Sequence, residues 1–173
     1  SLDVLWLPNE DMWIRRSFPV GEVPLSRILP HQSKSRSMVS GAAIPWKLNR
    51  NVRDGALQSG GKEFGWGFGV HAMSDLSFQV PPFIRSFRTA VGLDRAAGAK
   101  GGCVKALILL AAGKKQTKLF ESPHIVGSTK VIDTGAIQLP TATKTRLLHL
   151  HIDPAHRGRP KNTDPFDIRD MTN

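Results

Sequence analysis

The segment TRLLHLHID, residues 145–153, alternates apolar and polar side chains with a period of two. Successive side chains of an extended strand point to opposite faces. The apolar members of this alternation are Leu148, Leu150 and Ile152. The polar members are His149, His151 and Asp153. The pattern predicts a strand with one face in a protein core and the other outside it.

Shorter segments with strand character recur on the N-terminal side of this one, separated by Gly, Pro and Asp turns. We expect them at residues 64–70, 76–80, 87–93, 118–120 and 130–133. Residues 104–112 could also form a short helix, because Ala and Leu favour one. Glycines flank that segment and its side chains alternate, so we predict a strand. Strands at such spacing favour an all-β fold, an antiparallel β-sandwich.

The first 44 residues differ from the rest in their sequence pattern, which is irregular and has prolines spaced along it. Within them, residues 4–7 and 12–14 predict two short strands of a hairpin. Residues 31–40 are rich in Ser and Lys, which indicates a linker or mobile loop. We therefore divide the chain into a short β-rich N-terminal extension, residues 1–44, and a β-sandwich, residues 45–173. The chain does not begin with Met, and we expect it to be part of a larger protein.

The chain is basic, with 24 Lys and Arg against 14 Asp and Glu among 173 residues. A net charge of +10 favours acidic partners through long-range attraction. The cations are dispersed, however, and gather in only two places. These are Lys114, Lys115 and Lys118, and Arg157, Arg159 and Lys161. A solubilising surface and a polyanion-binding surface both remain open.

Other features exclude whole classes of protein. No apolar run approaches the roughly 20 residues of a membrane-spanning helix, so we expect no membrane partner. The single cysteine, Cys103, excludes an intrachain disulfide and is expected as a small buried side chain. There is no Gly-x-Ser-x-Gly segment and no tyrosine, and the basic residues do not interleave with aromatic ones. We therefore expect neither catalysis nor nucleic-acid binding.

Seven segments, taken in order, carry a resemblance to a known family. They are residues 46–57, 67–78, 87–94, 102–104, 120–122, 131–136 and 164–168. Together they resemble the NPCBM family of carbohydrate-binding modules, which are often appended to glycoside hydrolases. The resemblance implies a galactose-binding-like jelly-roll fold and non-catalytic binding of a carbohydrate by loops at one end. It implies a galactose-type sugar or an acidic glycan as partner, and we expect an extracellular or periplasmic parent protein.

The candidate sugar site is formed by Trp66, His71, Ser74 and Asp75, near one strand and its exit loop. Sugar recognition needs an apolar aromatic face and charge-assisted hydrogen bonds, which Trp66 and His71 could supply. Trp66 could instead fill the core, and the nitrogens of His71 could satisfy backbone groups. By parity Trp66 and His71 point to opposite faces, so a shared ligand requires the strand to bend between them.

Two metal sites are conceivable. Asp94, Asp164 and Asp167 could contribute to a calcium site, which takes six to eight oxygen ligands. Asp94 follows a strand and could equally cap a turn. His149 and His151 have a spacing that zinc sites use, with Asp153 or His156 as a third ligand, although we expect solvent-facing histidines. No other cofactor is expected. A protein-interaction domain without a sugar site is the main alternative function, and polyanion binding is a third.

Overall fold

The computed structural model describes residues 2–7, 12–17, 21–37, 41–155, 157–161 and 171–172. Almost all regular structure in these ranges is β-strand, as expected. The helical segments there are two 3-10 turns, Leu25–Arg27 and Arg95–Ala97. Within the described part of the chain, no helix has the length and apolar character needed to cross a membrane.

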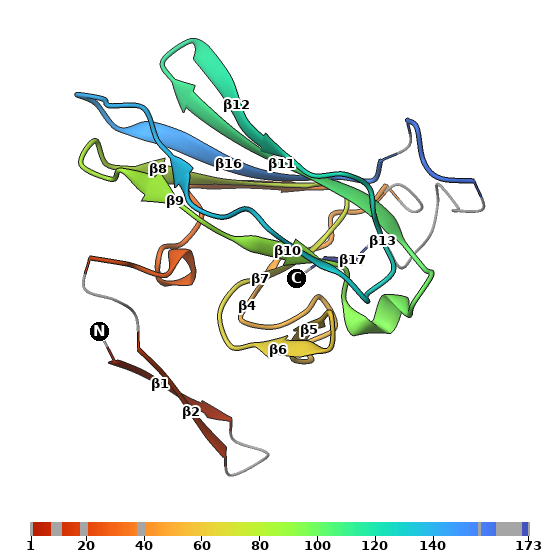
Figure 1. Ribbon diagram of the computed structural model, residues 1–173. Helices are drawn as coiled ribbons and strands as arrows, with labels where there is room; N and C mark the ends of the chain where they lie inside the picture. Colours follow the sequence, from red (N-terminus) through yellow and green to blue (C-terminus); the bar gives the residue numbers. More distant parts are fainter. Residues whose placement is uncertain are drawn as a thin grey trace.

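The larger layer is an antiparallel sheet in the spatial order β12–β11–β16–β8–β3, with β13 also paired to β11 (Figure 1). Its strands are β3 (Gln32–Ser35), β8 (Ser74–Val80), β11 (Cys103–Ala112), β12 (Lys115–Glu121), β13 (Ile125–Val126) and β16 (Arg146–Asp153). In the middle of the sheet, Leu150 pairs with Ile108 on one side and with Leu76 on the other. The prediction of a strand rather than a helix at residues 104–112 is therefore confirmed.

The second layer consists of short strands that lie below the main sheet in Figure 1. They are β4 (Lys47–Leu48), β7 (Phe68–His71), β9 (Ser86–Phe87), β10 (Ala90–Gly92), β14 (Val131–Asp133), β15 (Ile137–Gln138) and β17 (Met171–Thr172). They pair as β17–β7–β4, β10–β14 and β15–β9. The single strand expected at residues 87–93 is therefore two strands, since β9 and β10 pair with different partners. The two layers form the antiparallel β-sandwich predicted for this chain.

The core lies between the two layers. Phe78 of β8 is fully buried, and its ring centroid is 5.3 Å from that of Phe68 on β7. Leu148 and Ile152 of β16 are also buried, while His149, which lies between them in sequence, is only half-buried. As the period-two alternation predicts, β16 turns Leu148 and Ile152 to the core, and Leu150 packs against the core partly buried.

The N-terminal part contains the two expected strands, β1 (Leu2–Leu7) and β2 (Met12–Ser17), which pair antiparallel with Trp6 opposite Trp13. We expected a linker or mobile loop at residues 31–40. This prediction is wrong for the four residues of β3, which join the main sheet through pairs such as Gln32 with Ser77. The edge of β8 presents backbone donors and acceptors that need partners. An exposed polar strand can satisfy them, because ladder hydrogen bonds do not depend on apolar side chains.

Candidate functional site

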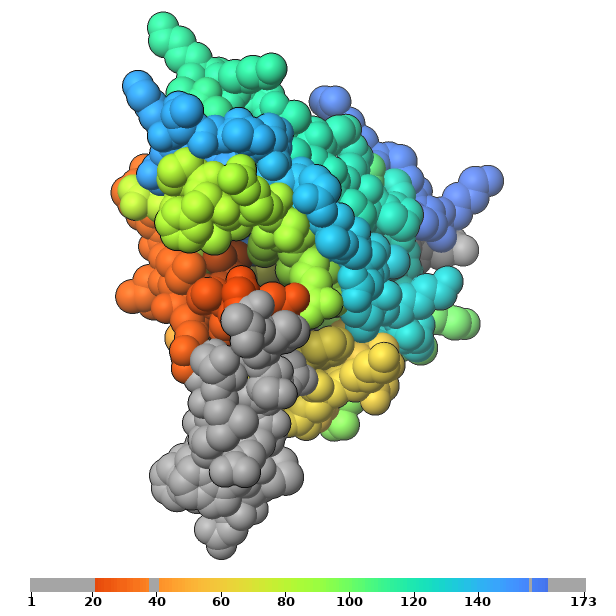
Figure 2. Space-filling model, turned by 60° about the vertical axis from the view of Figure 1, so that its left-hand side comes forward, coloured from red at the N-terminus to blue at the C-terminus, as the bar shows by residue number. Residues whose placement is uncertain are grey.

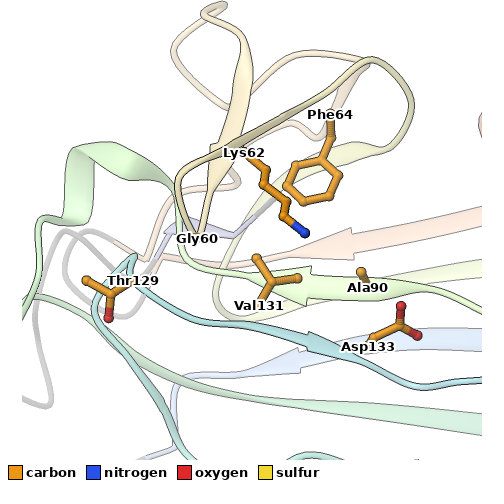
Figure 3. Close-up of a pocket in the computed structure, with 7 residues that line it drawn as sticks. All are labelled: Gly60, Lys62, Phe64, Ala90, Thr129, Val131 and Asp133. Atoms are coloured by element: carbon orange, nitrogen blue, oxygen red, sulfur yellow. The ribbon is translucent and has the colours of Figure 1, made fainter.

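A cleft opens between a small hairpin and the second layer of the sandwich. The hairpin consists of β5 (Leu57–Ser59) and β6 (Lys62–Phe64), and its neighbour is the β10–β14 pair. The cleft has a volume of about 280 Å³ (Figure 3). It is lined by Gly60, Lys62, Phe64, Ala90, Thr129, Val131 and Asp133.

The sequence places the lining side chains together through two simple relationships. Lys62 and Phe64 are two residues apart on one strand, so they lie on the same face of the hairpin. Ala90 and Asp133 are direct partners in the β10–β14 ladder, so they share a face of that pair. Figure 3 shows the side chains of Lys62 and Phe64 on the hairpin side of the cleft and Asp133 on the ladder side.

Glycines let the hairpin approach the ladder closely. Gly60 has φ +58° in the hairpin turn, and its N–H donates to the Ser128 carbonyl at 2.7 Å. A Cβ atom on Gly60 would lie 2.8 Å from Val131 Cγ2. A Cβ atom on Gly92 would lie 2.3 Å from the hydroxyl oxygen of Ser59. The absence of side chains at both positions therefore sets the position of the hairpin beside the ladder.

The cleft combines an apolar ring with polar groups that are open to solvent. Among the described residues, the ammonium of Lys62 and the hydroxyl of Thr129 have no hydrogen-bond partner, and both residues are exposed. Asp133 Oδ1 accepts a hydrogen bond from the Gly135 N–H at 2.8 Å, while the residue remains exposed. A small polar ligand with one apolar face could contact the Phe64 ring and hydrogen-bond to these groups.

The four residues predicted for the sugar site are not brought together. His71 is 7% exposed, and its Nδ1 lies 2.6 Å from the carbonyl of Ala72. Ser74 is 2% exposed, and Trp66 is half-buried before β7. Asp75 follows Ser74 on β8, so its side chain lies on the outer face of the main sheet. Sugar binding by this set stays a prediction that the geometry does not favour.

Asp75 belongs instead to a polar cluster on that outer face, defined by Asp75, Ser77, His149 and His151. Its carboxylate lies 3.2 Å from His149 Nδ1 and 3.4 Å from His151 Nδ1. Ser77 donates a hydrogen bond to Asp75 Oδ1 at 3.1 Å. Burial would raise the pKa of Asp75, but these hydrogen bonds and the nearby His149 charge outweigh it and lower the pKa from 3.8 to about 2. The carboxylate is therefore ionised over the ordinary pH range.

The polar cluster has the residue types of a serine-hydrolase triad but not its geometry. The Ser77 hydroxyl oxygen lies 2.8 Å from His149 Nδ1, and Asp75 Oδ1 contacts that same nitrogen. A triad needs the nucleophile on one ring nitrogen and the carboxylate on the other, so that a proton can move through the imidazole. The cluster therefore provides no such relay.

The structure supports the capping role for Asp94. Its Oδ1 accepts from the Ala96 N–H at 2.8 Å at the start of the 3-10 turn, and its Oδ2 accepts from the Asn51 amide at 3.0 Å. Both oxygens of the Asp94 carboxylate thus accept hydrogen bonds from protein N–H groups, whereas a calcium ion would need them as ligands. In the described ranges no three His, Cys, Asp or Glu side chains are placed to hold a metal ion. Asp164, Asp167 and His156 lie outside the described residues, so the calcium and zinc sites stay predictions.

The lining residues of the cleft were missed by the sequence analysis, although one local signal was present. Gly60-Gly61 between two short polar-apolar segments is typical of a tight hairpin turn, which would have placed Lys62 and Phe64 on one strand. No local signal brings that hairpin to Asp133, about 70 residues further along the chain. That contact depends on the tertiary fold.

The fold is similar to that of solved carbohydrate-binding modules. One is the CBM51 from Clostridium perfringens GH95 in complex with methyl-galactose, at 16% identity over 87% of this chain and 93% of that chain, with a TM-score of 0.63. Another is a structure of CBM51-2 in complex with GlcNAc and INT domains from Clostridium perfringens ZmpB. It is 16% identical over 95% of this chain, with a TM-score of 0.66, and this chain covers 33% of its length.

No curated protein matches the chain. A family model described as the NPCBM/NEW2 domain matches residues 22–166, which is most of the 173 residues and nearly all of the sandwich. Together with the jelly-roll fold, this match confirms the resemblance found in the sequence. The chain belongs to the NPCBM/NEW2 domain family of carbohydrate-binding modules.

Proposed function

We propose that the cleft between the β5–β6 hairpin and the β10–β14 pair is the sugar-binding site of this module. The observation that carries the proposal is the Phe64 ring beside three polar side chains, those of Lys62, Thr129 and Asp133. Carbohydrate rings present C–H groups to an aromatic face and hydroxyls to charged or polar partners. Family membership supports the same class of ligand.

The size of the cleft supports a single sugar unit as the ligand. Its volume of about 280 Å³ lies just below the roughly 300–1,000 Å³ that is usual for small-molecule sites. We propose a neutral pyranose of the galactose or N-acetylglucosamine type. The two similar structures described above contain methyl-galactose and GlcNAc, which supports this choice.

The same cleft does not support glycoside hydrolysis. Asp133 is the one carboxylate among its lining residues. Hydrolysis of a glycosidic bond ordinarily requires two carboxyl groups, about 5–9.5 Å apart, on either side of the scissile bond. We therefore propose that the cleft binds a sugar without cleaving it.

A glycan array followed by calorimetry with the best neutral ligand tests the proposal. Phe64→Ala should weaken binding at least tenfold, because the ring supplies the apolar contact. Leu48→Ala is the control, since Leu48 is an apolar side chain that is 37% exposed and lies outside the cleft. Lys62→Met should also weaken binding, whereas Lys130→Met should not. Equal affinity in Phe64→Ala and the unmodified chain would exclude this site.

A protein-interaction module is the second candidate, favoured by one observation. Val23, Ile28 and Leu29, around the first 3-10 turn, are 65%, 40% and 68% exposed. Exposed apolar side chains gathered in this way mark many protein interfaces. A chain that binds no glycan on the array, and whose self-association in sedimentation disappears in Leu29→Ser, would favour this function over sugar binding.

A further inference from the structure

Positive charge is concentrated at one end of the sandwich, although the residues that carry it are far apart in the sequence. Three segments that include the connections between strands meet there, at residues 81–85, 112–117 and 138–146, and none of them contains an Asp or Glu. They carry four exposed cations, Arg85, Lys114, Lys115 and Lys144, which we call the basic end. The described residues provide no ion pair to any of the four.

Backbone pairing and one buried side chain bring these loops together. Leu147 pairs with Ala111, and Lys144 and Lys114 each lie three residues beyond that pair, so the two cations extend from neighbouring strands. Arg146 is 3% exposed and donates hydrogen bonds to the carbonyls of Ile84 at 3.0 Å, Pro81 at 3.3 Å and Pro140. Figure 2 shows the three segments, coloured yellow-green, green-cyan and blue, side by side on the forward face.

Two neighbouring cations outside this set are neutralised by ion pairs. Arg88 pairs with Glu22 at 3.1 Å, and Lys118 pairs with Glu121. The four cations of the basic end therefore face solvent without a compensating acid in the described part of the chain. Such a surface attracts polyanions and binds them by releasing their counterions.

The other groups at this end favour a glycan over other polyanions. Phe83 is 70% exposed at the tip of a turn in which the Ile84 N–H donates to the Pro81 carbonyl at 3.2 Å. Thr117, Thr141 and Thr143 add exposed hydroxyls. The aromatic ring of Phe83 and the threonine hydroxyls, beside the four cations, suit a sugar ring that carries an anionic substituent. Single-stranded nucleic acid is usually held by several stacking aromatic side chains in succession.

We propose that the basic end is a second binding site, distinct from the cleft, for sulfated or carboxylated polysaccharide. Arg85, Lys114, Lys115 and Lys144 contact the anionic groups, and Phe83 contacts the C–H face of one sugar unit. The site lies on loops at one end of the sandwich, whereas the cleft lies between the hairpin and the second layer. The two sites can therefore be tested separately.

The test measures binding of the chain to immobilised dextran sulfate and to unsulfated dextran over a range of salt concentrations. The basic-end variant combines Arg85→Gln, Lys114→Gln, Lys115→Gln and Lys144→Gln. The control variant removes the same number of exposed cations elsewhere, with Arg53→Gln, Arg95→Gln, Lys100→Gln and Lys161→Gln. Both variants must unfold at the temperature of the unmodified chain, which shows that charge alone has changed.

We expect the basic-end variant to lose at least tenfold in affinity for dextran sulfate and to bind with a shallower salt dependence. The control variant should lose less than threefold, and Phe64→Ala should retain this binding. Equal loss in both charge variants would overturn the proposal, because it would show an effect of net charge. Preference for vesicles containing about 30% phosphatidylserine over dextran sulfate would also overturn it, because the partner would then be an anionic membrane.

Discussion

The side-chain amide of Asn51 donates a hydrogen bond of 3.0 Å to Asp94 Oδ2, although the two residues are 43 positions apart in the chain. Asn51 Oδ1 also accepts hydrogen bonds from the N–H groups of Arg53 at 3.0 Å and Gly55 at 2.9 Å. Asp94 in turn caps the 3-10 turn Arg95–Ala97. The side-chain amide of Asn51 therefore holds the loop that precedes the β5–β6 hairpin. It also connects this loop to the start of the 3-10 turn.

Replacement of Asn51 should destabilise the fold. Asn51→Ala removes a donor to the buried carboxylate of Asp94 and an acceptor from two N–H groups at exposed positions. Removing a hydrogen-bond partner from a buried polar group costs about 1–3 kcal/mol, and more for a charged one. We expect the free energy of unfolding in urea to fall by about 2 kcal/mol or more. Gln138→Ala, at an exposed position, is the control and should change it by less than about 0.5 kcal/mol. A similar small change in Asn51→Ala would show that water replaces the amide.

Gly69 should tolerate no side chain. A Cβ atom there would lie 2.1 Å from the Arg50 carbonyl oxygen and 2.7 Å from Asn51 Cα, and both are backbone atoms that cannot rotate away. We expect Gly69→Ala to cost more than about 3 kcal/mol in unfolding free energy, or to prevent folding. Gly113→Ala is the control, because it has φ +61° but no atom within 4 Å of its Cβ, and it should cost about 1 kcal/mol. Comparable losses at both positions would place the Arg50–Asn51 backbone further from β7 than the structure shows.

The polar cluster on the outer face of the main sheet should make stability depend on pH in the acid range. Asp75 has a folded-state pKa of about 2, below its ordinary value of 3.8, so the native state binds fewer protons than the unfolded chain. The resulting stabilisation is complete above pH 3.8 and disappears as the pH falls towards 2. Unfolding curves of the unmodified chain and Asp75→Asn should therefore differ most above pH 3.8 and converge as the pH approaches 2.

Glu63→Gln removes an exposed carboxylate outside the polar cluster and serves as the charge-matched control. Its unfolding free energy should follow that of the unmodified chain through the same pH range. A difference for Asp75→Asn that stays constant with pH would mean that Asp75 stabilises the fold by packing and not through its ionised form.

Much of the fold could be predicted from local patterns. Alternation identified β8, β11 and β16, because each has one face in the core and the period of the side chains reports it directly. The strand β3 could not be identified in this way, since its four residues are Gln, Ser, Lys and Ser and none is apolar. It is part of the sheet because β8 has a free edge, and that is a property of the assembled fold.

The candidate site was harder to predict for a related reason. Asp75 and Ser74 are adjacent in sequence, but on a strand they point to opposite sides of the sheet, so a site that needs both was improbable by parity alone. The same parity places Arg146 on the apolar face with Leu148, where a charged side chain is unusual and therefore informative. The cleft required a contact between β6 and β14 that the sequence does not encode locally.

Arg146 should control the loops that carry the basic end without touching the ligand. It is buried, and its guanidinium serves three loop carbonyls, those of Pro81, Ile84 and Pro140. Arg146→Met keeps an apolar stem but removes the charged donor from all three carbonyls, of which that of Pro81 still accepts from the Ile84 N–H. We expect it to cost about 3 kcal/mol in unfolding free energy, because hydrogen bonds from a charged donor are worth about 1.5–3 kcal/mol each and only part of that is recovered by water.

Hydrogen exchange can separate this role from a general loss of stability. The amides of Ile84 and Leu139 donate to the Pro81 and Arg85 carbonyls at 3.2 and 2.8 Å, so they report on the two loops that Arg146 holds. In Arg146→Met they should exchange faster than the amides of β11, and affinity for dextran sulfate should fall although no exposed cation is removed. Arg88→Met, an exposed cation paired with Glu22, should leave both amides protected. Unchanged protection in Arg146→Met would mean that the β9–β15 pairing alone holds these loops in place.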